Sequence, residues 1–230
     1  TGLSNSDNLT NVARPTFRVE FDKTRAEAGD KIQVVKGGVV LGEIELDSTT
    51  LAQGTSSVGY VDIQLASATP LVSGDNALVA VHRDATGNVA TSTVGLAVRL
   101  DTTNPSIGGA QSTVTFTEKQ GAEDSSNDVA LSLSASDTNN VVSGSVSIAS
   151  AQTGDRLVYA TPGSGVTVTP SGDSSLSFTA TSAAQSALAS FLSSIKFDNT
   201  SETPTAGSRT VNYSVTDAAG NSSSTSVSVN

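Results

Sequence analysis

The sequence predicts an all-β protein built from two tandem β-sandwiches, at residues 1–102 and 103–230. Short segments in which apolar and polar residues alternate recur along the chain, as expected of half-buried strands. A pentad of the form Asp-x-x-Gly-Asn occurs twice, at residues 84–88 and 217–221, about one domain length apart. The chain has 230 residues, which is enough for two such domains.

The first half shows the size and rhythm of an immunoglobulin-like sandwich, with about seven short strands in roughly 100 residues. Phe17, Val19 and Phe21 fall on one face of the first clear strand. The Cys…Trp…Cys signature of antibody domains is absent, because the chain has no Cys and no Trp, so only the architecture is predicted. Further strands are expected at residues 31–35, 39–46, 61–65, 77–83 and 94–100.

A short, stiff linker at residues 101–105 is expected to separate the halves, because Pro105 restricts the residue before it. The domain boundary is therefore predicted between about residues 100 and 113. The second half returns to strand alternation, except near residues 182–194. There Ala184, Leu188, Leu192 and Ile195 share a helical face. Ser182 and Gln185 fit a capping box, so one helix is predicted to pack on the second sandwich.

Composition excludes several functional classes. The 22 acidic and 12 basic residues give a net charge of −10, which argues against nucleic acid as a partner. The chain has no long apolar stretch, so no membrane span is predicted. Without Cys, neither a disulfide framework nor thiolate metal ligands are expected. The sequence begins at Thr1 without a signal segment, which is typical of a fragment of a longer chain.

No catalytic constellation stands out, so the chain is predicted not to be an enzyme. His82 is the single histidine and is expected at the rim of the first core in a structural role. No Gly-x-Ser-x-Gly elbow supplies a nucleophile. Asp155, Asp173 and Asp198 are interpreted as turn residues.

The pentads have two interpretations. Gly supplies a positive φ, Asn tolerates one, and Asp can accept a hydrogen bond from the backbone two residues on, so each pentad can be a turn alone. The alternative is Ca²⁺, which takes six to eight oxygen ligands from carboxylates, amides and carbonyls. On this interpretation Asp101, just after the strand that follows the first pentad, returns to the same end of its sandwich and meets Glu118 or Asp137.

Several stretches resemble known families. Residues 1–105 resemble bacterial immunoglobulin-like repeats of very large surface adhesins, and residues 113–229 resemble a cadherin-like repeat of biofilm and repeats-in-toxin-type adhesins. The first resemblance rests on Ser6–Asn11, Arg14–Phe17, Gly37–Gly42, Asp84–Asn88 and Asp101–Pro105. The second rests on Thr117–Glu118, Ser136–Asp137, Ser143–Ile148, Gly154–Leu157, the predicted helix, Ile195–Thr200 and Arg209–Asn221.

The resemblance implies a structural segment of a bacterial cell-surface adhesin, outside the cell, made rigid by Ca²⁺ at domain junctions and supporting adhesion or biofilm formation. Its partners would be neighbouring repeats of the same chain. A ligand-recognition module for a glycan or peptide on another cell is the second interpretation. An accessory domain of a secreted polysaccharide-active enzyme is the third.

The Ca²⁺ ligands expected at the central junction come from both domains. A preceding repeat and a following repeat would complete further sites. Cadherin-type sites often show Asp-x-Asp, whereas this chain has Asp137-Thr138-Asn139, which supplies one charge fewer. The predicted ligands are Asp84, Asn88, Asp101, Glu118 and Asp137 at the centre, Asp7 towards a preceding repeat, and Asp217 and Asn221 towards a following one.

Overall fold

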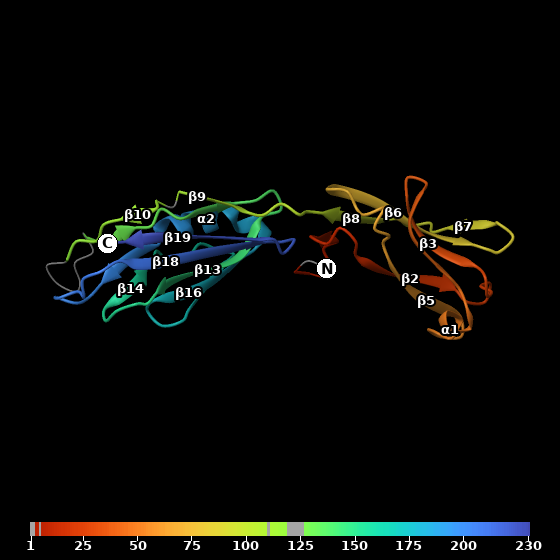
Figure 1. Ribbon diagram of the computed structural model, residues 1–230, viewed down its shortest axis with the longest axis horizontal. Coiled ribbons are helices and arrows are strands. Elements are labelled where there is room, and N and C mark those ends of the chain that lie inside the picture. The colour runs from red at the N-terminus through yellow and green to blue at the C-terminus, as the bar shows by residue number, and fades with distance from the viewer. Residues whose placement is uncertain (1–2, 5, 110, 119–126) are drawn as a thin grey trace. The chain divides into compact units, whose positions relative to one another are not determined.

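The computed structural model describes residues 3–4, 6–109, 111–118 and 127–230. The chain divides into two compact units, Thr1–Thr102 and Thr103–Asn230. Both units are built almost entirely of strands, so the predicted all-β class with tandem sandwiches is confirmed (Figure 1).

The first unit has two layers of sheet. One sheet has the order β1-β8-β6-β3-β4, with β7 also on β6, and the other pairs β2 with β5. Its core lies between the layers, with Ile32, Leu65 and Leu78 almost fully buried. The strands are β1 (Leu9–Thr10), β2 (Thr16–Asp22), β3 (Lys31–Lys36), β4 (Val39–Glu45), β5 (Val58–Gln64), β6 (Gly74–Arg83), β7 (Val89–Thr91) and β8 (Leu96–Leu100).

Local sequence explains the turns of this unit. Gly37 and Gly38 have positive φ and close the hairpin from β3 to β4. A one-turn helix, α1 (Ser48–Leu51), was not predicted. It forms because the Asp47 side chain accepts hydrogen bonds from the amides of Thr49 and Thr50, and the Asp47 amide in turn donates to the Thr50 hydroxyl.

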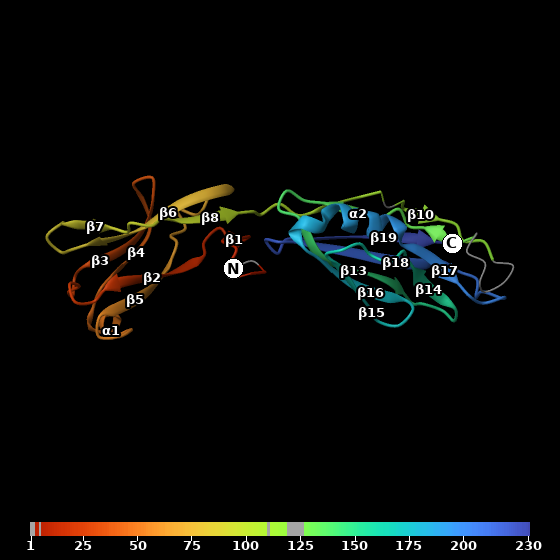
Figure 2. The same cartoon turned by 180° about the vertical axis from the view of Figure 1, so that it is seen from behind.

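The second unit is dominated by a six-stranded sheet of order β10-β19-β18-β13-β16-β15. Figure 2 shows β18, β13, β16 and β15 side by side. A three-stranded sheet, β11-β17-β14, and the pair β12-β9 complete the strands. Their bounds are β9 (Ser106–Gly108), β10 (Thr113–Val114), β11 (Val129–Ala130), β12 (Ser134–Ser136), β13 (Val141–Ala149), β14 (Asp155–Val158), β15 (Val166–Pro170), β16 (Ser175–Ala180), β17 (Lys196–Asn199), β18 (Arg209–Asp217) and β19 (Ser222–Val229).

The predicted helix is present as a 3₁₀ turn, η1 (Ser182–Ala184), followed by α2 (Gln185–Ser194). Leu188, Phe191 and Leu192 are buried, and the Phe191 ring packs edge-on against Phe178 of β16, with the ring centroids 5.8 Å apart. The helix therefore covers the inner face of the large sheet.

The predicted capping box is wrong. The helix N-terminus has no side-chain cap, and Gln185 instead bonds both backbone groups of Val141, at 3.0 and 3.2 Å. The physical reason is that the Gln185 amide satisfies the start of β13, which sequence spacing within the helix cannot reveal. Among the described residues, no helix is long and apolar enough to cross a membrane.

Candidate metal centre

The first pentad forms a turn that its own side chains complete. One oxygen of Asp84 accepts hydrogen bonds from the amides of Thr86 and Asn88, at 2.9 and 2.8 Å. The other accepts from the Asn88 side-chain amide at 2.6 Å, and this bond lowers the pKa of Asp84 to about 2. Gly87 has a φ of +98°, the conformation for which glycine is suited.

The second pentad repeats this geometry in a buried setting. Asp217 accepts from the backbone amide of Asn221 at 2.8 Å and from its side-chain amide at 2.9 Å. The exposed fraction of Asp217 is 0%, whereas Asp84 is half-buried. A carboxylate removed from water needs partners, and it also binds a cation more strongly than an exposed one does.

Asp137 lies beside this buried carboxylate. Asp137 and Asp217 each offer an oxygen, and these two oxygens lie within 4.8 Å of one another. The sheet brings them together: Val141 at the start of β13 pairs with Asp217, and the Ala218 amide donates to Asn140 at 3.1 Å. Two carboxylates so near each other repel unless a cation or a proton lies between them.

This pair lies at the end of the second unit where the chain enters it. The Ser223 hydroxyl, next to the second pentad, donates to the Pro105 carbonyl at 2.7 Å. Ser106 of β9 pairs with Ser136 of β12, directly before Asp137. The prediction that Asp217 and Asn221 face a following repeat is therefore wrong.

The structure does not bring Asp84 and Asn88 together with Asp101. Gly74, at the start of β6, lies opposite Leu100, and the pentad follows the far end of the same strand. β6 has 10 residues, so at about 3.3 Å per residue the pentad lies roughly 30 Å from the end of the sheet where Asp101 follows Leu100. The sequence interpretation overlooked that the return strand carries the chain away from the turn before Asp101 is reached.

Two other predicted ligands also lie elsewhere. Glu118 is near the opposite end of the second unit from Asp217, because the Phe116 amide donates to Asn230 at 2.7 Å, just beyond the end of β19. The prediction that Glu118 joins Asp137 is thus wrong. Asp7 accepts a bond from the Leu9 amide at 3.0 Å and lies near β1, which pairs with Arg99 and Leu100 at the exit end of the first unit.

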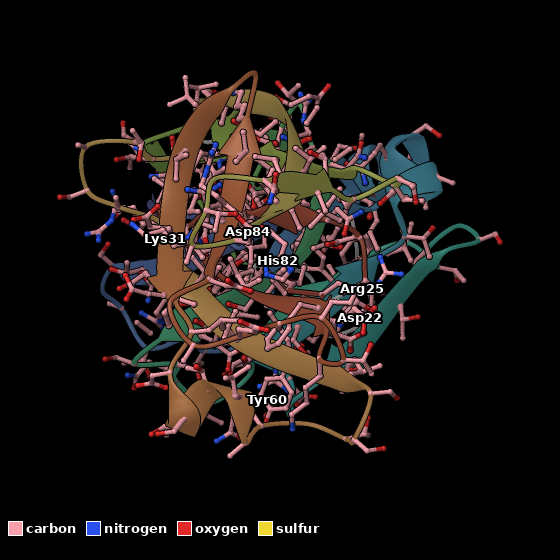
Figure 3. All side chains as sticks on the ribbon, turned by 90° about the vertical axis from the view of Figure 1, so that its right-hand side faces the viewer. Asp22, Arg25, Lys31, Tyr60, His82 and Asp84 are labelled. Atoms are coloured by element: carbon pink, nitrogen blue, oxygen red, sulfur yellow. The ribbon has the colours of Figure 1, made fainter. Side chains whose placement is uncertain are left out.

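His82 has a structural partner. Its Nε2 lies 2.8 Å from a carboxylate oxygen of Asp30, which also accepts bonds from the amides of Glu27 and Ala85. Burial acts to raise the pKa of Asp30, but these hydrogen bonds outweigh it and the pKa is lowered. Figure 3 looks at this end of the first unit, with His82 and Asp84 labelled near its centre. The pair ties β6 to the segment before β3.

Sequence reasoning missed a buried polar network in the second unit. Asp155 and Asp198, interpreted as turn residues, lie buried in β14 and β17. Asp155 accepts from Arg209 and from Asn199, both at 2.7 Å, and Arg209 also donates to two carbonyls. The partners are more than 40 residues apart in sequence, so no local pattern signals them.

The first unit matches a known protein family. Residues 1–102 match the bacterial Ig-like domain family. This match agrees with the resemblance of residues 1–105 to bacterial immunoglobulin-like repeats, and we call the first unit the Ig-like unit. No curated protein matches the chain.

Solved structures also align with the chain, at TM-scores below 0.5. Fibronectin(III)-like modules of Clostridium thermocellum CbhA align at a TM-score of 0.40 and 10% identity, covering 100% of this chain and 92% of theirs. The human Desmocollin-1 ectodomain aligns at 0.29 and 11%, covering 96% and 37%. A tetra-tandem repeat from the extending region of a large adhesion protein aligns at 0.26 and 15%, covering 94% and 49%.

Proposed function

We propose that this chain is a non-catalytic structural segment of a bacterial surface adhesin, stiffened by Ca²⁺ at the linker between its units. The observation that carries the proposal is the close approach of the Asp137 and Asp217 carboxylates, at the end of the second unit where the linker docks. The match of residues 1–102 to the bacterial Ig-like domain family supports an extracellular structural role at the cell surface.

The donor chemistry fits a hard cation. Asp137 and Asp217 supply two carboxylates of the second unit. We expect Asp101, at the end of the Ig-like unit just before the linker, to supply a third. Ca²⁺ accepts such oxygens together with carbonyls and water. Asn139 in place of a second aspartate reduces the negative charge by one, which weakens the affinity of the site.

The ion would neutralise the repulsion between the carboxylates, because each of them would bind it. Without it, the carboxylates would repel each other, and we expect the linker to bend more freely. With it, residues on both sides of the linker bind one ion, so neighbouring repeats of a long chain are held in a fixed direction. A ligand that binds only the folded state adds about 2.7 kcal/mol of stability at a hundredfold excess over its Kd.

The two pentads provide a matched test. Calorimetric titration with Ca²⁺ after chelation should give binding for the wild type and a Kd at least about tenfold weaker for Asp217→Asn, a loss of about 1.4 kcal/mol. Asp84→Asn removes the same charge from the same turn motif far from the linker, and should bind as the wild type does. Asp137→Asn should behave like Asp217→Asn.

A second measurement tests stiffening. Small-angle scattering should show a narrower distribution of chain dimensions in millimolar Ca²⁺ than in EDTA, and the melting temperature should rise. Equal scattering and melting profiles in the two buffers, with no heat of binding, would show that both pentads are turns alone.

A further inference from the structure

One face of the large sheet in the second unit carries hydroxyl and amide side chains throughout. These residues alternate with the buried ones, such as Val211, Tyr213 and Val215 of β18. We call this surface the hydroxyl face. It consists of Ser222, Ser224, Ser226 and Ser228 of β19, Thr210, Asn212, Ser214 and Thr216 of β18, Ser143, Ser145 and Ser147 of β13, Ser175, Ser177 and Thr179 of β16, and Thr167 and Thr169 of β15.

The hydroxyl face has no charge. The five strands contain two charged residues, Arg209 and Asp217, and both are buried. The contrast with the Ig-like unit is clear, since the exposed positions of its strand β2 are largely charged, with Arg18, Glu20 and Asp22. In a chain of net charge −10, the hydroxyl face is therefore a broad neutral surface.

The chemistry of the face is complementary to itself. A hydroxyl both donates and accepts, so two such surfaces can bond in many registers. Neighbouring strands already show this pairing: Ser145 and Ser214 lie 2.9 Å apart, and Thr216 and Ser222 2.8 Å apart, between their hydroxyl oxygens. The side chains are small, which allows close approach of a second sheet, and a hollow of about 430 Å³ lies along β18 and β19.

We propose that the hydroxyl face binds the same face of a second copy of this chain. Acidic copies repel each other over most of their surfaces, and the repulsion is weakest where both faces are neutral. Charged residues are also depleted at the cores of protein interfaces. A twofold axis through the face gives a closed, self-complementary contact. This inference goes beyond the proposed Ca²⁺ function and is independent of it.

A glycan is a poorer occupant. The hydroxyl face presents no aromatic ring on which a sugar could stack, because the ring of Tyr213, the one aromatic residue of β18, is buried on the other side. Its lack of charge also excludes recognition of acidic sugars or lipids through ion pairs. Self-association uses the donors and acceptors that are present on both partners.

The area of the face limits the size of the contact. Five strands spaced about 4.8 Å apart, with outward side chains about 6.7 Å apart along each strand, give roughly 500 Å² per copy. The total of about 1,000 Å² lies at the low end of specific interfaces. A single contact is therefore weak, and many copies on long parallel chains would multiply it through high effective concentration.

Sedimentation velocity of the whole chain tests the proposal, in EDTA, from micromolar to millimolar concentration. The wild type should associate reversibly, and added salt should not weaken the association, because no ion pairs hold the two faces together and salt screens the repulsion between the acidic copies. The double variant Ser177→Asp, Ser224→Asp places exposed charges on two strands of the face, and should lower the association constant at least about tenfold. Its unchanged melting temperature would show that it folds.

The matched control places two aspartates on the opposite side of the unit. Ser182→Asp with Ser186→Asp changes exposed residues of η1 and α2 by the same charge, at a helix N-terminus where acidic residues are tolerated. Association should stay as in the wild type. Equal losses in both double variants, a wild type that remains monomeric at millimolar concentration, or binding of a neutral oligosaccharide at the face without self-association would overturn the proposal.

Discussion

Replacing Arg209 with Met is expected to lower the melting temperature of the second unit strongly and to leave the Ig-like unit unchanged. The Arg209 guanidinium donates to Asp155 at 2.7 Å, to Gly207 at 2.5 Å and to Thr205 at 2.8 Å. The side chains of Arg209 and Asp155 are only 7% and 0% exposed. Methionine preserves most of the apolar stem but removes every one of these bonds.

The magnitude follows from burial. Removing one partner of a buried ion pair leaves the other charge without compensation and costs about 3–5 kcal/mol. In a unit of this size, that corresponds to a fall in melting temperature of about 10–20 °C. Adding Asp155→Asn to Arg209→Met removes the isolated carboxylate, so the double variant should regain part of the lost stability.

Differential scanning calorimetry can separate the two units, because only the transition of the second should move. Arg18→Met is the control: Arg18 also donates two bonds to a carboxylate, Asp62, at 2.9 Å each, but the two side chains are 58% and 47% exposed. An exposed pair contributes little, so this variant should melt almost as the wild type does. A fall of less than about 1 kcal/mol for Arg209→Met would refute the reasoning from burial.

Three smaller predictions concern acid, an isolated hydroxyl and a glycine. The folded pKa of Asp84 is about 2, below its ordinary value of 3.8. The contribution of Asp84 to stability is therefore present above pH 3.8 and is lost as the pH falls towards 2. The melting temperature of Asp84→Ala, measured against pH, should lack this acid-dependent loss. The buried Tyr213 hydroxyl has no hydrogen-bond partner among the described residues, so Tyr213→Phe should raise the free energy of unfolding by about 1 kcal/mol in urea titrations. A methyl group at Gly144 would collide with the Ser214 carbonyl and the Phe178 ring, so Gly144→Ala should lower that free energy by about 1–3 kcal/mol in the same assay.

Local patterns predicted what local forces determine. The alternation at Phe17, Val19 and Phe21 identified a strand because burial of one face repeats every second residue. The spacing from Ala184 to Ile195 identified the helix for the equivalent reason. Each pentad was correctly recognised as a turn, since Asp, Gly and Asn complete it within five residues.

What the sequence could not supply was the position of these turns along the sheets. Asp84 and Asp217 begin the same motif. Asp84 follows the end of β6 that lies away from Leu100, whereas Asp217 lies beside Asp137. That difference depends on strand register across many residues. The bond between Arg209 and Asp155, 54 residues apart, was missed for the same reason.

The parallel pairing of a short early strand with the last strand of each unit has a consequence for mechanics. In the first unit the first strand, β1, runs parallel to the last, β8. In the second unit the second strand, β10, runs parallel to the last, β19. Amides near the end of β8 donate to Asn8 and Thr10 at 2.9 Å, and those near the end of β19 donate to Ser112 at 3.0 Å and Val114 at 2.9 Å. When a chain is pulled from both ends, parallel neighbours slide in opposite directions, so the bonds of each ladder bear the force together in shear. Antiparallel neighbours pulled apart at one end would break one bond after another. A chain held under tension at both ends would thus resist it through these short parallel pairings.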